Sequence, residues 1–305
     1  MYAGKTDHIN LKRFYPFLAC LAEAARFNPN KPPHRAMGHA ILNSPNPGAR
    51  PTDLPDGSAA NLVVLGEPVS HSDVIGWWRS AASSPVRSKL FRRIQREGYL
   101  LPILTSICVA LLRDMYTTSP DGQTRHRVRL QFGSSPISDF GIAKGQATVT
   151  SQDRLAYPYL SDDTFEAGQD PENHYWIYFR NLKGQTVTLD VGMFTFNLYL
   201  YVSGQPYFKD IHSVMIPPVS APAYFVDREM LRSAPNATKM TSEFSFLRNA
   251  QLQAAVASQN TDWAPVFRLM KAISGSKLTT IETRFTKDVV LDSCRAMMQV
   301  IQNRS

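Results

Sequence analysis

The stretch from His174 to Asp190 (HYWIYFRNLKGQTVTLD) constrains the fold most, because apolar and polar side chains alternate on both sides of a short turn. Successive side chains of a strand point to opposite faces of a sheet, so the pattern predicts an antiparallel hairpin. We place the centre of the turn at Leu182, since a shift by one residue would mix apolar and polar side chains on each face. The apolar face then collects Ile177, Phe179, Val187 and Leu189.

The polar face of this hairpin begins with His174 and ends with Asp190. The predicted register sets the two residues directly opposite each other, with Cβ atoms about 5 Å apart. An imidazole held by a carboxylate is two thirds of a nucleophilic triad, and Trp176 and Tyr178 on the same face would then line a substrate cleft. The alternative is an ordinary hairpin with a polar cross-strand pair, because short motifs often match by chance.

Composition places the chain among globular proteins. Of its 305 residues, 43% are hydrophobic and 19% are charged. This length is enough for one large domain or two. No apolar run approaches the ~18 residues of a membrane span, and the N-terminus lacks the apolar core of a signal peptide. The three cysteines, Cys20, Cys108 and Cys294, are widely spaced and predict neither a disulfide framework nor a zinc site. We therefore expect a protein of the cytosol or nucleus.

The positive charge is concentrated in the first part of the chain. Residues 1–130 hold 17 of the 33 basic residues and 9 of the 25 acidic ones, whereas the rest is balanced. A basic patch falls on a predicted helix and comprises Arg87, Lys89, Arg92, Arg93 and Arg96. We expect these charges on a solvated helix face that could hold an acidic partner. Nucleic-acid binding is not favoured, because no aromatic-stacking motif, helix-turn-helix signature or zinc finger accompanies them.

No cofactor is predicted from the sequence. His34 and His39 lie in a loop rich in proline and glycine, and no acidic residue or cysteine stands at metal-ligand spacing from them.

The order of the predicted elements is helices, then strands, then helices, which indicates an α+β fold. We expect an antiparallel sheet over about 125–216, packed by helices that precede it in the chain, and a mixed core domain over 1–223 with a loop-rich passage at 28–60. A helical C-terminal segment, 224–305, would pack on this core. The predicted helices are 8–27, 86–97, 101–116, 241–258, 262–274 and 286–302, the last with Thr286 as its N-cap.

Ser138-Asp139-Phe140-Gly141 matches the Asp-Phe-Gly motif that binds Mg²⁺ in protein kinases. A kinase also needs a Gly-rich loop, a strand lysine that pairs the phosphates, and a catalytic-loop aspartate and asparagine. None of these is found at the required place, so we reject the kinase interpretation. We expect the segment to be a turn between strands.

One order of elements in the chain deserves comparison with known families. A predicted helix carries Cys108, and a strand follows it. The next strand opens with His174-Tyr-Trp176, and the last closes on Asp190. This order resembles the core of transglutaminase-like and papain-like cysteine enzymes. The resemblance covers about 108–190 and implies Cys108 as nucleophile, His174 as base and Asp190 as the acid that orients the base. The sequence departs from the family at Ile107, where the family has a small residue, and Cys108 falls within an apolar stripe. A buried core thiol is therefore the alternative, and Cys20 is a second candidate nucleophile.

Several further segments resemble a group of uncharacterised intracellular proteins of mushroom-forming fungi, which implies a fungal source and no chemistry. They are Asn10-Leu-Lys-Arg-Phe-Tyr-Pro-Phe17, His39-Ala-Ile-Leu-Asn-Ser-Pro-Asn-Pro-Gly48, Asp139-Phe-Gly-Ile-Ala143, Gln152-Asp-Arg-Leu-Ala-Tyr157 and His174-Tyr-Trp-Ile-Tyr178.

Two functional hypotheses remain from the sequence. The first is a cysteine-dependent amide hydrolase or acyltransferase of transglutaminase-like type, acting on a protein or peptide. The second is a non-catalytic interaction or scaffold protein, a pseudoenzyme, that binds an acidic partner through its basic N-terminal half.

Overall fold

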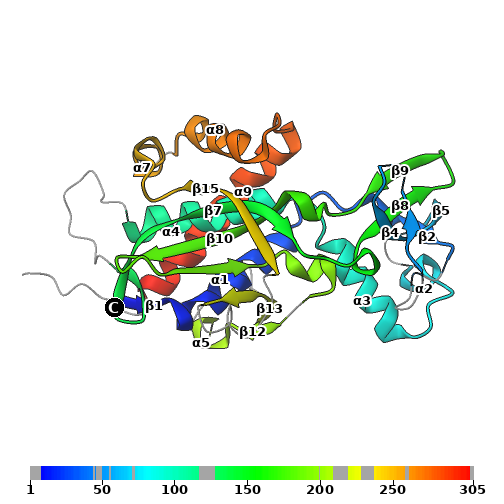
Figure 1. Cartoon of the computed structure of the whole chain (residues 1–305), viewed down its shortest axis with the longest axis horizontal. Coiled ribbons are helices and arrows are strands. Elements are labelled where there is room, and N and C mark those ends of the chain that lie inside the picture. The colour runs from blue at the N-terminus through cyan, green and yellow to red at the C-terminus, as the bar shows by residue number, and fades with distance from the viewer. Residues whose placement is uncertain are drawn as a thin grey trace, which may run out of the picture.

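The computed structural model describes residues 8–43, 45, 50–54, 56–70, 73–116, 128–198, 200–208, 219–227, 237–257 and 261–302. It confirms the mixed α+β class, with 43% helix, 29% strand and three sheets, one of them curled into a half-barrel. The molecule has a larger lobe and a smaller lobe, which lies at the right of Figure 1.

The larger lobe is built on a seven-stranded sheet, in the order β1-β6-β7-β10-β11-β14, with β15 paired to β7. All of its pairings are antiparallel except that of β1 with β6. The strands are β1 (His8–Asn10), β6 (Arg129–Phe132), β7 (Ser135–Ala147), β10 (His174–Asn181), β11 (Thr186–Asp190), β14 (Tyr224–Val226) and β15 (Thr238–Ser245). A separate two-stranded sheet pairs β12 (Tyr201–Ser203) with β13 (Ser220–Pro222). The first residues of the strand predicted from 125 lie outside the described part of the chain.

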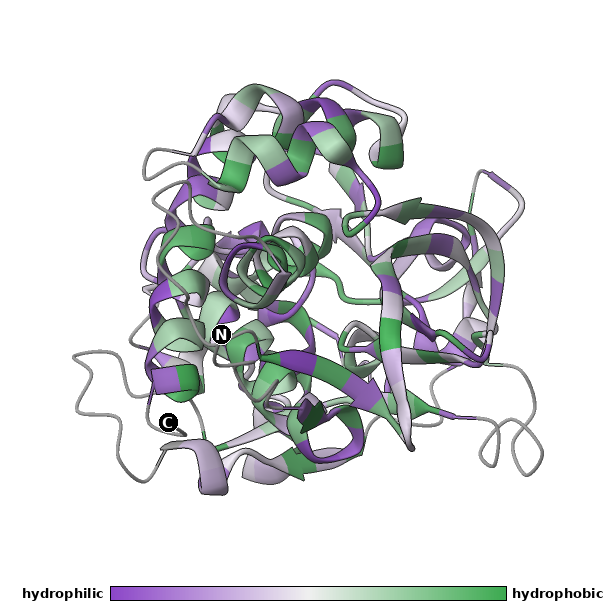
Figure 2. Cartoon of the chain, turned by 90° about the vertical axis from the view of Figure 1, so that its left-hand side faces the viewer, coloured by the Kyte–Doolittle hydropathy of each residue, from purple (hydrophilic) through white to green (hydrophobic). Residues whose placement is uncertain are grey.

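The central element of the larger lobe is helix α4, in which every residue is buried. Its sequence, LLPILTSICVAL, is apolar on all sides, as expected of a helix that is covered all round. Figure 2 shows hydrophobic residues gathered toward the middle of this lobe. The helices are α1 (Leu11–Arg26), α4 (Leu100–Leu111, followed by a π-helical turn, Leu112–Tyr116), α5 (Gln205–Phe208), α7 (Ala250–Ala257), α8 (Trp263–Ser274) and α9 (Thr280–Gln302).

The smaller lobe has its own sheet and its own core. The sheet order is β2-β5-β8-β4-β3, with β9 paired to β8. Its core is formed by Trp77, Trp78, Tyr157, Tyr159 and neighbouring aliphatic side chains, separate from the core of the larger lobe. The strands are β2 (His39–Ile41), β3 (Thr52–Asp53), β4 (Ala59–Leu62), β5 (Leu65–Pro68), β8 (Leu155–Tyr159) and β9 (Thr164–Ala167), and the helices are α2 (Val74–Trp77) and α3 (Ser84–Gln95). The described residues also form four short 3-10 helices, at Arg35–Gly38, Ser151–Asp153, Pro171–Asn173 and Met193–Phe196.

The predicted hairpin is formed by β10 and β11, but its register differs by two residues. Ile177 pairs with Leu189, which moves the centre of the turn from Leu182 to Lys183. The reason lies in Gly184, whose φ is 73°. A three-residue hairpin loop ends with a residue in the left-handed region, where glycine is favoured.

A shift by two residues keeps every side chain on its face, so the predicted segregation is confirmed. The four apolar side chains of one face lie in the main core: Ile177, Phe179, Val187 and Leu189. His174 and Asp190 remain on the other face, but they are diagonal neighbours. The expectation that they stand directly opposite each other is wrong.

The Asp-Phe-Gly segment is part of a strand, and the turn predicted there is wrong. It lies inside β7, the longest strand of the sheet. Gly141 is needed because a Cβ at this position would lie 2.0 Å from the carbonyl oxygen of Phe244 on β15. The carboxylate of Asp139 accepts hydrogen bonds from Tyr178 and Ser245, so it is engaged inside the protein.

Two details of the predicted C-terminal segment are also wrong. Residues 238–245 form strand β15, which extends the large sheet, where the sequence suggested a helix from 241. Helix α9 begins at Thr280, and Thr286 is a buried residue within it whose hydroxyl donates to the carbonyl of Glu282.

Among the described helices, no single one is long and apolar enough to cross a membrane. The segments Ser84–Gln95 and Leu100–Tyr116 reach that length and hydropathy only as a pair, which is bent by 69°.

Candidate functional site

His174 and Asp190 form a closed, buried pair. Nε2 of His174 lies 2.7 Å from Oδ2 of Asp190, and the imidazole is 0% exposed. The imidazole reaches its partner across the diagonal of the two strands, a distance that a long side chain can span. The other oxygen of Asp190 accepts the backbone N–H of Gly192 at 2.8 Å. Both carboxylate oxygens are therefore satisfied within the protein.

Arg26 on α1 fixes the chain directly after this pair. Its Nη2 donates to the carbonyl of Val191 at 2.8 Å, and its Nη1 donates to the carbonyl of Arg96. Burial lowers the pKa of Arg26 to about 10, an effect opposed by the nearby Glu23. The guanidinium thus stays charged at neutral pH and joins α1 to the end of β11.

Glycine at position 192 lets helix α4 and the imidazole approach each other. A Cβ there would lie 2.7 Å from Cε1 of His174 and 2.7 Å from Cδ2 of Leu100. Leu100 is the first residue of α4. The N-terminal end of the central helix therefore faces His174 with a leucine side chain.

The second nitrogen of His174, Nδ1, has no partner among the residues that the structure describes. Nδ1 is buried and makes no hydrogen bond within the described part of the chain. A buried polar atom of this kind costs free energy, so it needs an explanation. In a Cys-His-Asp arrangement the carboxylate takes one ring nitrogen and the nucleophile takes the other. Nδ1 is thus the nitrogen that a nucleophile would use.

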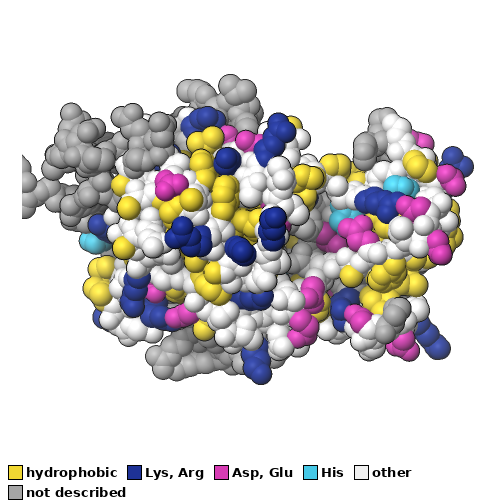
Figure 3. Space-filling model, turned by 90° about the horizontal axis from the view of Figure 1, so that it is seen from above, with side chains coloured by type: hydrophobic (Ala, Val, Ile, Leu, Met, Phe, Trp, Pro, Cys, Tyr) yellow, Lys and Arg dark blue, Asp and Glu magenta, His cyan; other side chains and the backbone are white. Residues whose placement is uncertain are grey.

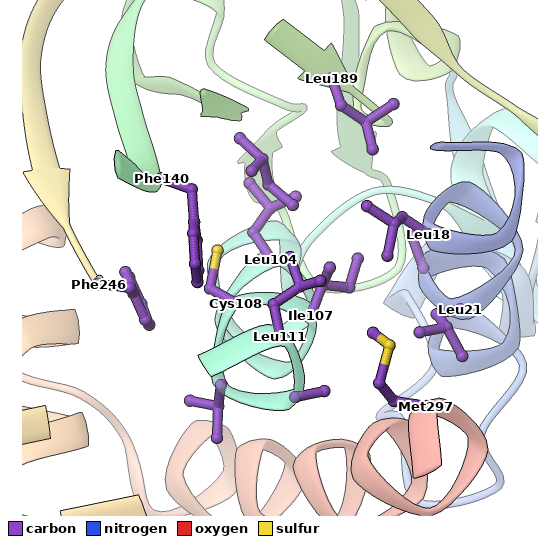
Figure 4. Packing of buried hydrophobic residues seen from close by; sticks show 14 of the residues in the cluster. Leu18, Leu21, Leu104, Ile107, Cys108, Leu111, Phe140, Leu189, Phe246 and Met297 are labelled. Atoms are coloured by element: carbon purple, nitrogen blue, oxygen red, sulfur yellow. The ribbon is translucent and has the colours of Figure 1, made fainter. Parts of the chain in front are cut away.

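Cys108, the predicted nucleophile, lies in the hydrophobic core of the larger lobe. It belongs to the cluster that holds Ile177 and Phe179, on the opposite face of β10 from His174. Figure 4 shows its sulfur among apolar side chains such as Leu104. Burial raises the pKa of the Cys108 thiol, and no hydrogen bond to it occurs among the described residues.

The position of Cys108 along its helix also separates it from the pair. It follows Leu100 by eight residues, which corresponds to about 12 Å along a helix axis. The structure therefore brings together His174 and Asp190 but does not bring Cys108 to them.

The other two cysteines are also buried and free. Burial raises the pKa of the Cys20 thiol to about 12, opposed by a backbone hydrogen bond with Gly204. Burial likewise raises the pKa of Cys294 to about 12. A thiol with a raised pKa is a poor nucleophile at neutral pH, because the thiolate is the reactive form.

Trp176 and Tyr178, which were expected to line a substrate cleft, are buried. They form a small cluster with Ala143 on β7. The hydroxyl of Tyr178 donates to Asp139 at 3.2 Å. These two side chains serve packing and hydrogen bonding within the sheet.

The predicted basic patch does not form a single solvated face. Arg93 is 8% exposed and donates to the carbonyls of Thr195 and Asp153. Arg96 is 3% exposed and forms an ion pair with Glu23 on α1. These two arginines join α3 to other parts of the fold, which corrects the expectation of a solvated helix face. Of the remaining three residues, Arg92 is exposed, and Arg87 and Lys89 are half-buried.

A second polar cluster, which the sequence did not reveal, lies in the cleft between the lobes. It consists of His34, Glu97 and Glu166, and all three line one cavity. Nε2 of His34 is 3.7 Å from Oε2 of Glu97 and 3.6 Å from Oε1 of Glu166. Figure 3 shows acidic side chains beside a histidine in the hollow between the lobes.

Tyrosines of the smaller lobe hold the two carboxylates of this cluster. The Tyr157 hydroxyl donates to Oε1 of Glu97 at 2.9 Å, and the Tyr159 hydroxyl donates to Oε2 of Glu166 at 2.9 Å. Burial raises the pKa of Glu97 to about 7, although the Tyr157 hydrogen bond opposes the shift. Glu97 therefore changes its charge near neutral pH, a property that is common at functional sites.

The pKa of His34 is lowered by burial, against the pull of Glu166. Its Nδ1 accepts the backbone N–H of Ala36 at 3.2 Å. A protonated ring would have to break that hydrogen bond, because both ring nitrogens would then be donors. The neutral ring, with its proton on Nε2, is the form that fits the structure.

Little in the sequence could have found this cluster. Its three residues come from distant parts of the chain: a loop before β2, the segment directly after α3, and β9. One local signal is the acidic Glu97, which follows the basic helix α3 by two residues. Within the described residues, no group of three or more His, Cys, Asp or Glu side chains is arranged to hold a metal ion.

Comparisons of the chain with protein-family models, with curated proteins and with solved structures find no match.

Proposed function

We propose that this chain is a non-catalytic binding protein, built on a scaffold of the transglutaminase-like type, that holds its ligand in the cleft between its lobes. The ligand would then be held in the cleft and not by the basic residues of α3.

The arrangement of α4, β10 and β11 supports the scaffold. A central helix packs on an antiparallel sheet, one strand supplies His174 and the next supplies Asp190. In the cysteine enzymes that the sequence resembles, the nucleophile stands near a helix N-terminus, which lowers its pKa. The corresponding end of α4 faces His174 here.

One observation carries the proposal: a leucine stands where such an enzyme needs a nucleophile. Leu100 begins α4 beside His174, and its side chain carries no nucleophilic atom. Nδ1 of His174 agrees with this interpretation, because among the described residues no group bonds to the nitrogen that a nucleophile would use. The pair then acts as a buried link between the ends of β10 and β11.

The state of the three cysteines also favours a non-catalytic protein over a cysteine-dependent hydrolase or acyltransferase. All three thiols are buried, and burial raises each of their pKa values. The cleft, in contrast, is open and lined by polar groups, so it is the better place for a ligand.

Thiol labelling of the native protein tests the proposal. We expect iodoacetamide at pH 6 to label none of the three cysteines at a measurable rate, because the thiolate form is disfavoured in each case. Rapid labelling of one native cysteine that is lost in His174→Ala would contradict the proposal.

The variant Leu100→Cys provides the positive counterpart. It places a thiol at the start of α4 beside His174, so we expect labelling at pH 6 at least about tenfold faster than in Leu100→Cys/His174→Ala. Leu101→Cys is the matched control, because it shares the helix terminus but occupies the next position around the helix. Equal labelling rates of Leu100→Cys and Leu100→Cys/His174→Ala would contradict the view that Leu100 stands at the position of a nucleophile.

A further inference from the structure

The cleft between the lobes contains a cavity of about 440 Å³, which is within the ~300–1,000 Å³ range of small-molecule sites. The larger lobe contributes the first turn of α4 and the start of β10, and the smaller lobe contributes the loop before β2 and the chain after β9. Besides the cluster of His34, Glu97 and Glu166, the walls carry amides, carboxyl groups and two tyrosines. They include Tyr99, Gln169, Asp170, Asn173, Tyr175 and Glu282.

The polar groups of the cluster converge on this cavity without bonding to one another. The distances of 3.7 and 3.6 Å from Nε2 of His34 to Glu97 and Glu166 are too long for hydrogen bonds. The His34 side chain is only 8% exposed, and its proton is assigned to Nε2 because Nδ1 accepts from Ala36. The His34 side chain thus presents to the cavity an N–H donor that makes no hydrogen bond within the described residues, and this donor lies between two carboxyl groups.

A hydroxyl group fits this arrangement. Its oxygen accepts a hydrogen bond from the His34 N–H while its proton is donated to a carboxylate. An ammonium group has only donors, so Glu97 and Glu166 could accept from it, but it would leave the His34 N–H without an acceptor. A phosphate or carboxylate has only acceptors, and it would be repelled by Glu166 and, above pH 7, by Glu97 as well.

The tyrosines of the cavity suit the same kind of ligand. Tyr99 and Tyr175 both line the cavity, and such rings offer an apolar face together with a polar tip. Tyr99 has a φ of 56°, directly after Gly98 with a φ of 73°. A bulky residue in the left-handed region is strained, and such strain is often found where a side chain is held for a ligand.

We propose that the cavity between the lobes binds a neutral polyhydroxylated ligand of the sugar or polyol class, with a ligand hydroxyl held between His34, Glu97 and Glu166. This inference rests on the proposed function, in which the cleft is the binding site, and it adds the chemistry of the ligand. The tyrosines would cover the apolar C–H faces of the ring, and the amides would bind further hydroxyls.

Calorimetric titration of the whole chain with maltose, cellobiose and myo-inositol tests the inference, with spermidine as the cationic comparison. We expect at least one of the three hydroxylated probes to bind, and spermidine to bind more weakly. His34→Phe keeps an aromatic ring against Tyr157 but removes the donor, so it should weaken binding about tenfold or more. Glu166→Gln keeps an acceptor and should weaken binding less, roughly threefold.

Glu67→Gln is the matched control, because Glu67 is an exposed carboxylate on β5 in the smaller lobe. This variant should leave binding unchanged. Circular dichroism of each variant shows whether it is folded, and Glu166→Gln carries the test if His34→Phe fails to fold. The inference is overturned if none of the three probes binds, if binding is equal in all variants, or if spermidine binds more tightly. If only spermidine binds, the ligand class is wrong, but the proposed function as a non-catalytic binding protein stands. If a bound disaccharide is cleaved, the proposed function is wrong, but the ligand class stands.

Discussion

The protein contains two histidine–carboxylate groupings, and their geometry sets them apart. His174 and Asp190 are joined by a hydrogen bond of 2.7 Å in a fully buried setting. His34 stands 3.6–3.7 Å from Glu97 and Glu166 beside a cavity. The first grouping satisfies its carboxylate internally, and the second leaves room for another group. The residue types that suggest catalysis in a sequence are thus compatible with a structural link in one place and a ligand site in another.

The largest expected effect concerns the structural pair. Asp190→Ala would leave a buried imidazole and the Gly192 N–H without their partner, and we expect the free energy of unfolding to fall by about 3–5 kcal/mol. Urea unfolding measures it. Glu166→Ala, the corresponding change in the cleft, should cost less than about 1 kcal/mol, because that side chain is 43% exposed. Similar losses in the two variants would remove the distinction between the groupings.

The second effect is a dependence of stability on pH through Glu97. Its pKa is raised by burial from 4.5 to about 7 in the folded protein. Between these values the folded state holds a proton that the unfolded state has lost, so the contribution to stability is full below pH 4.5 and is lost as the pH rises through 7. The loss is on the order of 3 kcal/mol, at about 1.4 kcal/mol for each pKa unit.

Urea unfolding at pH 5 and pH 8 measures this dependence. Neighbouring groups that also act on Glu97 are Arg93, Tyr157 and Glu166. Glu97→Gln should flatten the decline, because the amide does not titrate. If stability declines with pH in this variant as it does in the native protein, other groups cause the pH dependence, and Glu97 does not titrate in this range.

The smallest effect concerns the glycine that closes the first grouping. Gly192→Ala would place a methyl group 2.7 Å from both His174 and Leu100. We expect a loss of about 1–3 kcal/mol from overpacking, with a displaced imidazole. Thermal unfolding together with the histidine side-chain NMR signals measures it. An alanine variant as stable as the native protein would mean that α4 and the imidazole can move apart freely.

The larger lobe could be predicted in good part from local patterns. The apolar stripe of α4 and the alternation in β10 and β11 are properties of neighbouring residues, and the structure confirms both. The sequence prediction is wrong where contacts between distant chain segments determine the local structure. Gly141 suggests a turn in the sequence, but it lies within β7, and glycine is needed there because β15 approaches the backbone too closely for a Cβ.

Tertiary contacts also determine which of the charged residues of α3 are buried. Arg93 and Arg96 have the spacing of an exposed helix face, yet backbone carbonyls and Glu23 from other elements bind them inside the protein. No helical pattern within α3 could reveal these partners.

The sequence by itself determined that His174 and Asp190 share one face of a hairpin, because side chains alternate strictly along a strand and burial penalises a mixed face. Only the tertiary structure decided which groups meet them. It placed Leu100 and not Cys108 beside the imidazole, and it brought His34, Glu97 and Glu166 together from three distant segments. The physical reason is that the strand period is a local property, whereas the packing of a helix end or of one lobe on another depends on the shape of the whole fold.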